Sequence, residues 1–513
     1  MKKYNYLLAS ICLPGMLTAQ SLTAQKQDRP NIIYIMSDDH ASQAVSAYGG
    51  ILSDVLPTPN IDRIGHEGAI LQNCFVTNSI STPSRGAIIT GQYSQKNGVY
   101  TLQDALDPNH PNVAKCLQEA GYQTSIIGKW HLHAEPTGFD YYNVLPGQGR
   151  YINPELIEKG QWENPAKEQR TGTVHQGHCT DVIGSEAIKC MENRDKTKPF
   201  FLMCHFKAPH RPWTPADRFK DLLKDVQVPE PENLLDIYDG KGKYASLLRL
   251  RLEDMRKTDV KRDIPTNMDR DELRHWMYQY YVKDYLRCIA GVDENVGRIL
   301  KYLDDNGLTE NTVIIYTGDQ GFFLGEHGWF DKRLMYEECL RMPFLIRYPK
   351  EIKSGTMNKD ITLNIDFAPL FLDYAKAEKP QQMQGESFRA NLVNKTPANW
   401  RKAMYYRYWM NADNDHNVTA NYGIRTDRYK LVFYYGESLG MTGTKNVSIR
   451  PAEWELYDLK NDPMEMHNIY NDPANKRLIK ELKTKLLELK KQYDDEDSKY
   501  PEMQKIAKEY YWK

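Results

Sequence analysis

The sequence predicts an α/β protein whose large domain has a mostly parallel central sheet covered by helices, followed by a smaller α+β domain with an antiparallel sheet. At 513 residues, the chain is long enough for two or more such units. Short apolar runs alternate with helical stretches up to about residue 393, and aromatic segments with alternating polarity follow. We therefore expect a large domain over residues 25–393 and a smaller one over residues 394–513.

Four apolar runs are the expected core strands, at residues 32–36, 125–127, 200–203 and 313–316. They are rich in β-branched and aromatic residues without alternation, which is typical of parallel strands buried on both faces. Polar residues follow each run at once. Because ligands gather at the carboxyl ends of such strands, the sequence predicts one shared site there.

Amphipathic stretches supply the expected helices. The clearest one places six apolar residues on one face and has Gly307 just beyond its end as a C-cap. These six residues are Leu286, Ile289, Val296, Ile299, Leu300 and Leu303. Near the C-terminus, residues 404–408 and 429–435 are expected strands, and a leucine-rich helix opens at Asp472 and Pro473. The short leucine repeat favours core packing over a zipper.

The tract over residues 145–179 is polar and contains five glycines. It is too long to be a plain connector between two elements. We interpret it as a surface insertion that borders the site.

Residues 1–24 have the pattern of a cleaved secretory signal peptide. Two lysines follow Met1, an apolar stretch extends over residues 6–17, and small residues then offer cleavage positions. We expect a periplasmic or secreted protein without a membrane span, because no other segment approaches about 18 apolar residues. Lipidation at Cys12 is the alternative, although the bulky Ile11 before it is unfavourable.

The nearly balanced net charge argues against nucleic acids and anionic membranes as partners. The chain has 67 basic and 68 acidic residues, so no global field attracts nucleic acid or an anionic membrane. Seven cysteines remain after the signal peptide, with no closely spaced pair. They are expected to be mostly buried small hydrophobic residues, with at most one bridge among them.

Residues 81–91 carry the most specific motif in the chain. They read Ser-Thr-Pro-Ser-Arg-Gly-Ala-Ile-Ile-Thr-Gly and match the pattern S/C-x-P-S-R-x-x-x-x-T-G throughout. This pattern resembles the type I sulfatases, which belong to the alkaline phosphatase superfamily. The resemblance covers most of residues 28–470 and implies an alkaline-phosphatase-like large domain. The start of a helix, expected around Pro83, is compatible with this resemblance because a helix N-terminus attracts anions.

The resemblance implies that Ser81 is oxidised to formylglycine. A plain serine hydroxyl is a weak nucleophile, and its sulfate ester would be as hard to hydrolyse as the substrate. In the family, the hydrated aldehyde attacks sulfur with one hydroxyl and expels sulfate with the other. The serine type implies a maturating enzyme that works without oxygen, and hence an anaerobic bacterial source.

Acidic residues at two strand ends predict a metal site. Asp38 and Asp39 follow the first run, and Asp319 and Gln320 follow the last. Adjacent carboxylates repel each other unless a cation neutralises them, and oxygen ligands favour Ca²⁺ or Mg²⁺. The resemblance assigns all four residues, together with Ser81, as metal ligands. Gln320 stands where the family commonly has Asn or His.

Three further blocks resemble sulfatase motifs, at residues 128–131, 208–213 and 325–332. The resemblance implies that Lys129 and Lys332 bind sulfate and that His131 contacts the nucleophile. It also implies that His210 protonates the leaving alcohol and that Arg85 holds the nucleophile and metal ligands. This density of positive charge suits a reaction in which negative charge develops on the bridging oxygen.

Residues 136–142, 145–149 and 331–333 look most like those of bacterial N-acetylglucosamine-6-sulfatases, which act on glucosamine 6-sulfates of heparin and heparan sulfate. We expect a hydrolase for such sulfated glycans, with Asp331 and neighbours of residues 145–179 contacting the sugar. One alternative is another glycan specificity, such as iduronate 2-sulfate or galactosamine 6-sulfate. Others are a phosphatase or phosphonate hydrolase of the same superfamily and, if Ser81 is unmodified, a non-catalytic glycan-binding protein.

Overall fold

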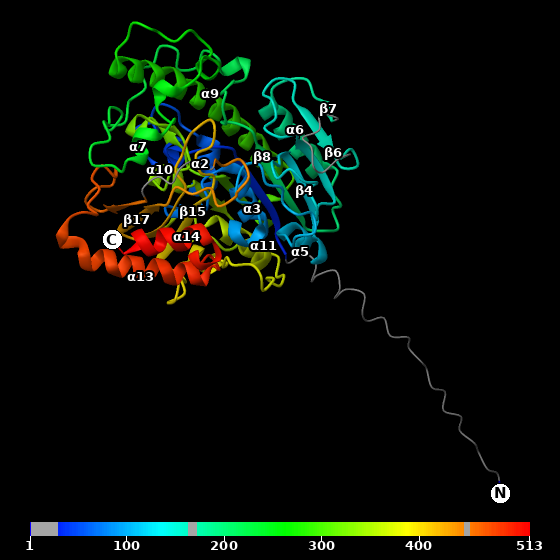
Figure 1. The fold of residues 1–513 in the computed structure, drawn as a ribbon. Helices are drawn as coiled ribbons and strands as arrows, with labels where there is room; N and C mark the ends of the chain where they lie inside the picture. The colour runs from blue at the N-terminus through cyan, green and yellow to red at the C-terminus, as the bar shows by residue number, and fades with distance from the viewer. Residues whose placement is uncertain (2–28, 163–171, 446–451, 513) are drawn as a thin grey trace.

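The structure is a computed structural model that describes Met1 and residues 29–162, 172–445 and 452–512 (Figure 1). The predicted signal peptide over residues 1–24 lies outside the described residues, apart from Met1. No helix among the described residues combines the length and apolar character needed to cross a bilayer.

A ten-stranded, mixed sheet forms the centre of the molecule. Its order is β13 (Thr356–Asn358), β2 (Ala69–Leu71), β12 (Phe344–Arg347), β9 (Thr312–Gly318), β1 (Asn31–Ser37), β8 (Phe200–Phe206), β4 (Gln123–Lys129), β5 (Tyr141–Leu145), β6 (Glu155–Glu158) and β7 (Thr173–Val174). The five strands from β9 to β5 are parallel, and antiparallel strands flank them. The four predicted core strands are confirmed as β1, β4, β8 and β9, which are neighbours in the sheet.

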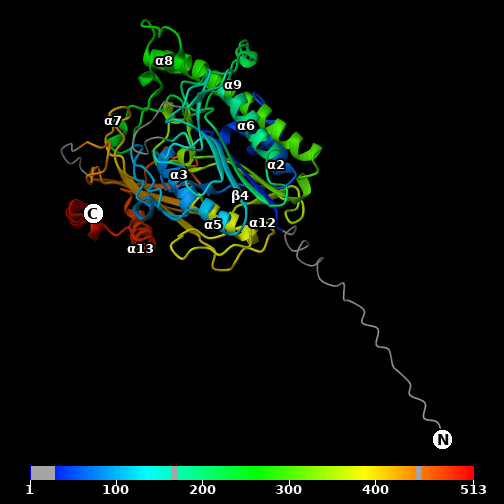
Figure 2. The ribbon, with the colours of Figure 1, turned by 90° about the vertical axis from the view of Figure 1, so that its right-hand side faces the viewer.

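Helices cover both faces of this sheet (Figure 2). One face packs against α2 (Pro59–His66), α6 (Cys179–Glu192) and α9 (Arg270–Asp305), and the other against α3 (Ser81–Thr90), α5 (Val113–Glu119) and α11 (Phe367–Tyr374). Alternation along β1 explains this division, because Ile33 and Ile35 point into one apolar core while Ile32 and Tyr34 point into the other.

The longest predicted helix is confirmed as α9. Its six predicted core residues are all at most 1 % exposed, and Gly307 follows the helix end in the left-handed region at φ +63°. The helix extends further toward the N-terminus than predicted, and Asp269 caps its first turn by accepting a hydrogen bond from the Glu272 amide.

The C-terminal part contains the predicted antiparallel sheet. Its strands are β15 (Ala403–Tyr408), β16 (Asn421–Thr426), β17 (Tyr429–Tyr434) and β18 (Glu453–Asp458), in sequence order. The predicted leucine-rich helix is α13 (Lys476–Gln492), and Leu482 and Leu486 on it are buried. Residues of this sheet share one apolar core with α3, α5 and α11.

The cysteines agree with the expectation of buried small hydrophobic residues. The seven beyond the predicted signal peptide are all unpaired, and five of them are buried.

Candidate active site

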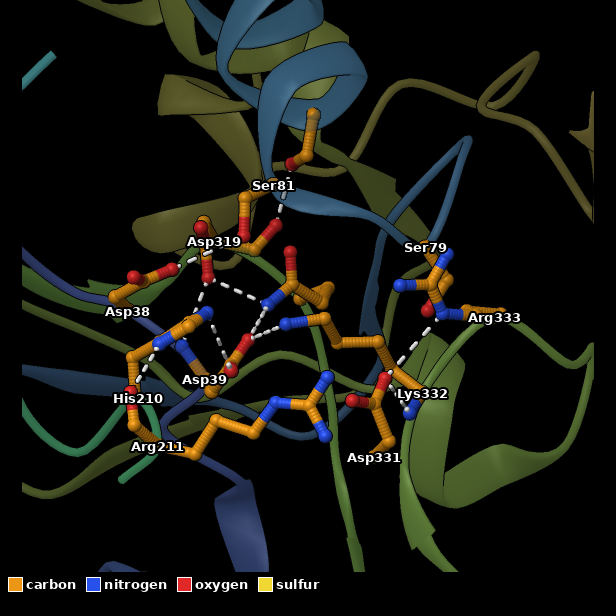
Figure 3. Close-up of polar contacts among 12 residues, drawn as sticks. Asp38, Asp39, Ser79, Ser81, His210, Arg211, Asp319, Asp331, Lys332 and Arg333 are labelled. Carbon is orange, nitrogen blue, oxygen red and sulfur yellow. Dashed lines mark hydrogen bonds and ion pairs between the residues drawn. The ribbon is translucent and has the colours of Figure 1, made fainter. Parts of the chain in front are cut away.

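Three carboxylates meet at the carboxyl edge of the sheet. Asp38 and Asp39 follow β1 and Asp319 follows β9, and one carboxylate oxygen from each lies within 4.8 Å of the others. Because β1 and β9 are adjacent parallel strands, their ends bring these side chains together (Figure 3). All three side chains are buried.

Gln320 completes an oxygen-rich set. Its amide nitrogen donates to Asp39 Oδ1 at 2.5 Å and to Asp319 Oδ1 at 2.7 Å. Its amide oxygen is buried and accepts no hydrogen bond within the described part of the chain. Three carboxylates and an orphaned amide oxygen suit a hard divalent cation such as Ca²⁺ or Mg²⁺.

The protonation of the cluster is consistent with a cation site. Burial raises the pKa of Asp39 to about 7, although Lys332 opposes this rise. Burial and the neighbouring Asp38 charge also raise the pKa of Asp319. Burial acts in the same direction on Asp38, but Lys129 and His210 hold its pKa well below the usual value. The cluster therefore carries negative charge that is costly without a nearby cation.

Ser81 begins α3 and faces this cluster. Its side chain is buried, and its hydroxyl donates to Asp38 Oδ1 at 3.0 Å. The first turn of α3 offers backbone N–H groups and the positive end of the helix dipole to an anion beside it. Gly91 ends the helix in the left-handed region at φ +65°, so the predicted motif spans the helix from its first residue to its C-terminal cap.

Arg85 lies one turn along α3 and links this helix to the carboxylates. Its Nη2 and Nε atoms donate to Asp319 Oδ2 at 3.0 and 3.2 Å, and Nη1 donates to the Lys129 carbonyl at 2.7 Å. Its Nη2 also lies 3.5 Å from Asp38. The predicted holding role of Arg85 is consistent with these contacts.

The two predicted sulfate-binding lysines converge on the cluster from different segments. Lys129 ends β4 and forms an ion pair with Asp38, while Lys332 follows β11 (Phe330–Asp331) and forms an ion pair with Asp39. Burial lowers the pKa of Lys129 to about 8. Burial opposes the charge on Lys332 as well, but Asp39 and Asp331 raise its pKa overall.

The predicted histidines occupy different positions relative to Ser81. His210 Nε2 lies 3.9 Å from Asp39, and its Nδ1 lies 2.7 Å from the Arg211 carbonyl, to which it donates. His131 Nδ1 lies 3.5 Å from the hydroxyl of Thr82, and His131 forms no hydrogen bond with Ser81 itself. Burial holds the pKa of both imidazoles well below the usual value, so both are neutral near pH 7.

Asp331, which the sequence predicted as a sugar contact, lies beside this centre. It is surrounded by side chains that the sequence analysis did not assign to the site. His416 Nε2 lies 3.4 Å from Asp331 and 3.0 Å from Arg211 Nη2. Arg333 lies 3.4 Å from Asp331 and 4.0 Å from Asp413. These residues come from three distant segments, so their spacing in the sequence gives no signal of the group. Arg211 and Arg333 stood within predicted blocks, at residues 208–213 and 331–333, whereas Asp413 and His416 did not.

A second missed contact comes from the polar tract that the sequence placed at the border of the site. Gln148 accepts a hydrogen bond from Lys129 Nζ at 2.6 Å, and its carbonyl accepts one from Lys207 Nζ at 3.0 Å. Tyr151 donates to the His210 carbonyl at 2.5 Å. This loop therefore touches the segments that carry a predicted sulfate ligand and the predicted general acid.

Several site residues also adopt an uncommon backbone conformation. Asp39, His131, Asp331 and Arg333 have φ values of +67°, +55°, +72° and +97°. Positive φ is unfavourable for residues with a Cβ and persists where the surroundings impose it. These four residues therefore carry backbone strain, and the surrounding fold holds their side chains in the site.

Comparisons with known proteins agree with this geometry. Residues 30–377 match the family model described as Sulfatase, and residues 325–492 match that of the N-sulphoglucosamine sulphohydrolase C-terminal region. An N-acetylglucosamine-6-O-sulfatase from Bacteroides thetaiotaomicron is 42% identical over 94% of this chain and 91% of its own length. An arylsulfatase from Clostridium perfringens is 25% identical over 94% of this chain and 98% of its own.

Solved structures extend the likeness to three dimensions. One protein, solved in complex with its substrate D-glucosamine-2-N,6-O-disulfate, superposes with a TM-score of 0.82 at 42% identity, covering 91% of this chain and 98% of its own. A phosphonate monoester hydrolase from Agrobacterium radiobacter superposes with a TM-score of 0.67 at 19% identity, covering 91% of this chain and 96% of its own. The second likeness shows the fold alone.

Proposed function

Because this chain belongs to the sulfatase family, within the alkaline phosphatase superfamily, we propose that it hydrolyses the 6-O-sulfate ester of N-acetylglucosamine or glucosamine. The observation that carries the proposal is the position of Ser81, at a helix N-terminus and 3.0 Å from a buried carboxylate of the three-aspartate cluster. The 42% identity with an N-acetylglucosamine-6-O-sulfatase supports the sugar.

The nucleophile requires modification of Ser81. Oxidation to formylglycine would supply a hydrated aldehyde, with one hydroxyl for attack on sulfur and another for release of sulfate. The surrounding residues suit such a group, because Asp38 accepts a hydrogen bond from the present hydroxyl and the α3 N-terminus would attract an anion bound at this position. The serine-type maturating enzyme is therefore a proposed partner.

A divalent cation would be held by Asp38, Asp39, Asp319 and the Gln320 amide oxygen, together with modified Ser81. When bound, such an ion would act as a Lewis acid toward a sulfate oxygen and favour the ionised nucleophile. Arg85 maintains the positions of Asp319 and Asp38 through its hydrogen bonds and charge. We propose Ca²⁺ as the ion, with Mg²⁺ as the alternative.

Positively charged side chains stabilise the negative charge that develops during the reaction. Lys129 and Lys332 lie against Asp38 and Asp39, so both ammonium groups can reach a sulfate bound at the cluster. His210 donates through Nδ1 to the Arg211 carbonyl, so its Nε2 atom is the one that exchanges a proton with the leaving oxygen. The anionic substrate favours protonation of this nitrogen.

Asp331 is our candidate for sugar recognition. Its carboxylate is buried beside the cluster and can accept hydrogen bonds from sugar hydroxyls. Replacing Asp331 with alanine should lower kcat/KM for the sulfated sugar much more than for a small aryl sulfate, which lacks those hydroxyls. Equal losses on both substrates would remove this role.

A desulfation assay tests the proposed function. Protein produced with a serine-type maturating enzyme is incubated with defined monosaccharides and disaccharides, and mass spectrometry of the Ser81 peptide follows the loss of two hydrogen atoms. We expect release of sulfate from glucosamine 6-sulfates. Preferential release from iduronate 2-sulfate or galactosamine 6-sulfate would correct the specificity, and preferential cleavage of phosphonate esters would refute sulfatase action.

Export is a second proposal. Residues 1–24 have the composition of a signal peptide, so the protein is proposed to act in the periplasm or outside the cell of an anaerobic bacterium. Fractionation of the native host with N-terminal sequencing of the mature protein tests this. An intact N-terminus in the cytoplasmic fraction would contradict it.

A further inference from the structure

Arg211 forms no ion pair with a described carboxylate, unlike four other cations of the site. Lys129, Lys332 and Arg85 lie against Asp38, Asp39 and Asp319, and Arg333 lies between Asp331 and Asp413. In the described part of the chain, no carboxylate lies within ion-pair distance of the Arg211 guanidinium. Its polar side-chain contact is with His416 Nε2, at 3.0 Å.

His416 cannot balance the charge of Arg211, because an imidazole carries no negative charge in the neutral or the protonated form. Its Nδ1 atom lies 2.8 Å from Asp413 Oδ1. The positive charge of Arg211 is therefore not compensated by an ion pair with a described carboxylate.

The position of Arg211 directs this charge toward Asp331, the proposed sugar-binding residue. Its backbone follows His210, but its side chain extends past the metal-ligand cluster toward Asp331 and Lys332 (Figure 3). Arg211 and Asp331 contact the same nitrogen of His416, and the guanidinium carbon lies 6.0 Å from the centre of the Phe330 ring. Arg211 is half-buried, which strengthens its attraction for an anion.

We infer that Arg211 binds a second anionic group of the substrate, a sulfate or a carboxylate other than the sulfate that is hydrolysed. The planar fork of a guanidinium matches two oxygens of either group. The inference rests on the proposed function and deepens it, because it makes doubly charged glucosamine sugars the preferred substrates. Arg211 then selects substrates that carry a second anionic group, while Lys129 and Lys332 bind the sulfate that is hydrolysed.

Binding to protein with unmodified Ser81 tests the inference without turnover. Calorimetry would compare three ligands: N-acetylglucosamine 6-sulfate, N-sulfated glucosamine 6-sulfate, and N-acetylglucosamine 6-sulfate linked to a uronic acid. Wild-type protein should bind at least one doubly charged ligand roughly ten- to a hundred-fold more tightly than the singly charged one, the range for a charge-assisted hydrogen bond. The ligand with the gain identifies whether the second group is on the same ring or the next.

The variant Arg211→Gln keeps a donor for His416 but removes the charge. It should lose the preference for the doubly charged ligand while changing the affinity for N-acetylglucosamine 6-sulfate less than threefold. Arg211→Lys should keep part of the preference. Arg249→Gln is a matched control, because exposed Arg249 contacts the same loop through the Asn414 carbonyl at 3.2 Å.

The outcomes separate this inference from the proposed function. An unchanged preference in Arg211→Gln, or equal losses for both classes of ligand, would overturn the role of Arg211 alone. If Arg211→Gln does not fold, equal affinities of the wild-type protein for singly and doubly charged ligands would overturn it. Failure of the wild-type protein to bind any of the three sugars would overturn the proposed substrate, and the inference with it.

Discussion

Replacing Arg85 with methionine removes the charge that links α3 to the carboxylate cluster while keeping an unbranched side chain. Arg85 is 3% exposed and donates two hydrogen bonds to Asp319 and one to the Lys129 carbonyl. In the metal-free protein, the variant leaves Asp319 buried without its principal counter-charge. We therefore expect a large loss of stability that depends on metal.

The magnitude follows from the short ion pair. Two unit charges about 4 Å apart attract by about 4 kcal/mol at an effective dielectric constant of about 20. Breaking a buried pair by removing one partner typically costs about 3–5 kcal/mol. We expect Arg85→Met to lower the free energy of unfolding by a similar amount. Saturating Ca²⁺ should restore at least half of this loss, because the ion replaces the missing positive charge beside Asp319.

Urea unfolding with EDTA or with Ca²⁺ would measure both quantities, with reversibility checked at each condition. Arg347→Met is the matched control, because Arg347 is 1% exposed and pairs with Glu67, outside the aspartate cluster. Its loss should not respond to Ca²⁺. A loss below about 1 kcal/mol for Arg85→Met, or equal recovery of both variants with Ca²⁺, would refute the reasoning.

Three further predictions concern Gln148, His210 and the binding of Ca²⁺. Gln148→Ala should lower kcat/KM about five- to thirtyfold, because the Lys129 ammonium loses a hydrogen bond that positions it. His210→Gln should lower kcat about 10²–10⁴-fold on the sugar sulfate and far less on an aryl sulfate, whose phenolate leaves without protonation. Because burial raises the pKa of Asp39 to about 7, the apparent Kd for Ca²⁺ should rise about tenfold per pH unit below 7.

A different result would contradict each of these predictions. Gln161→Ala, in the same tract, should leave kcat/KM unchanged, and an equal effect of both substitutions would argue for a general role of the tract. Equal losses of His210→Gln on both substrates would exclude proton transfer to the leaving group. A Kd for Ca²⁺ that is constant between pH 5.5 and 7, roughly the range where Asp39 titrates, would show that its proton does not compete with the metal.

The same raised pKa has a consequence for stability. The folded, metal-free protein binds the Asp39 proton more tightly than the unfolded chain, whose aspartates titrate near pH 4. The contribution of this group to stability is therefore full below about pH 4 and is lost as pH rises through about 7. Bound Ca²⁺ should remove this loss.

The sequence was sufficient to predict the central sheet, and the edge that carries the candidate site, for a physical reason. Buried parallel strands are continuous apolar runs, and the residues that end them must meet at one edge when the strands are neighbours. Asp38 and Asp319 are far apart in the chain, yet the adjacency of β1 and β9 brings them together. The predicted position of Ser81 at the start of α3 follows equally from local sequence.

The sugar side of the site could not be predicted in this way. His416 stands in a polar segment that reads as an ordinary loop, and only the packing of the C-terminal sheet brings it to Asp331. Gln148 likewise reaches Lys129 from a tract without secondary-structure periodicity. Such contacts depend on how distant segments dock, which local patterns do not encode.

Because residues 413–416 contribute to the site, the parts of the site become available at different times during synthesis of the chain. Synthesis from the N-terminus delivers the aspartates, Ser81, Lys129 and Lys332 before any strand of the C-terminal sheet. His416 and Asp413 arrive only with the last fifth of the chain, between β15 and β16. A nascent chain therefore carries the proposed reactive groups before the proposed sugar-recognition surface is complete.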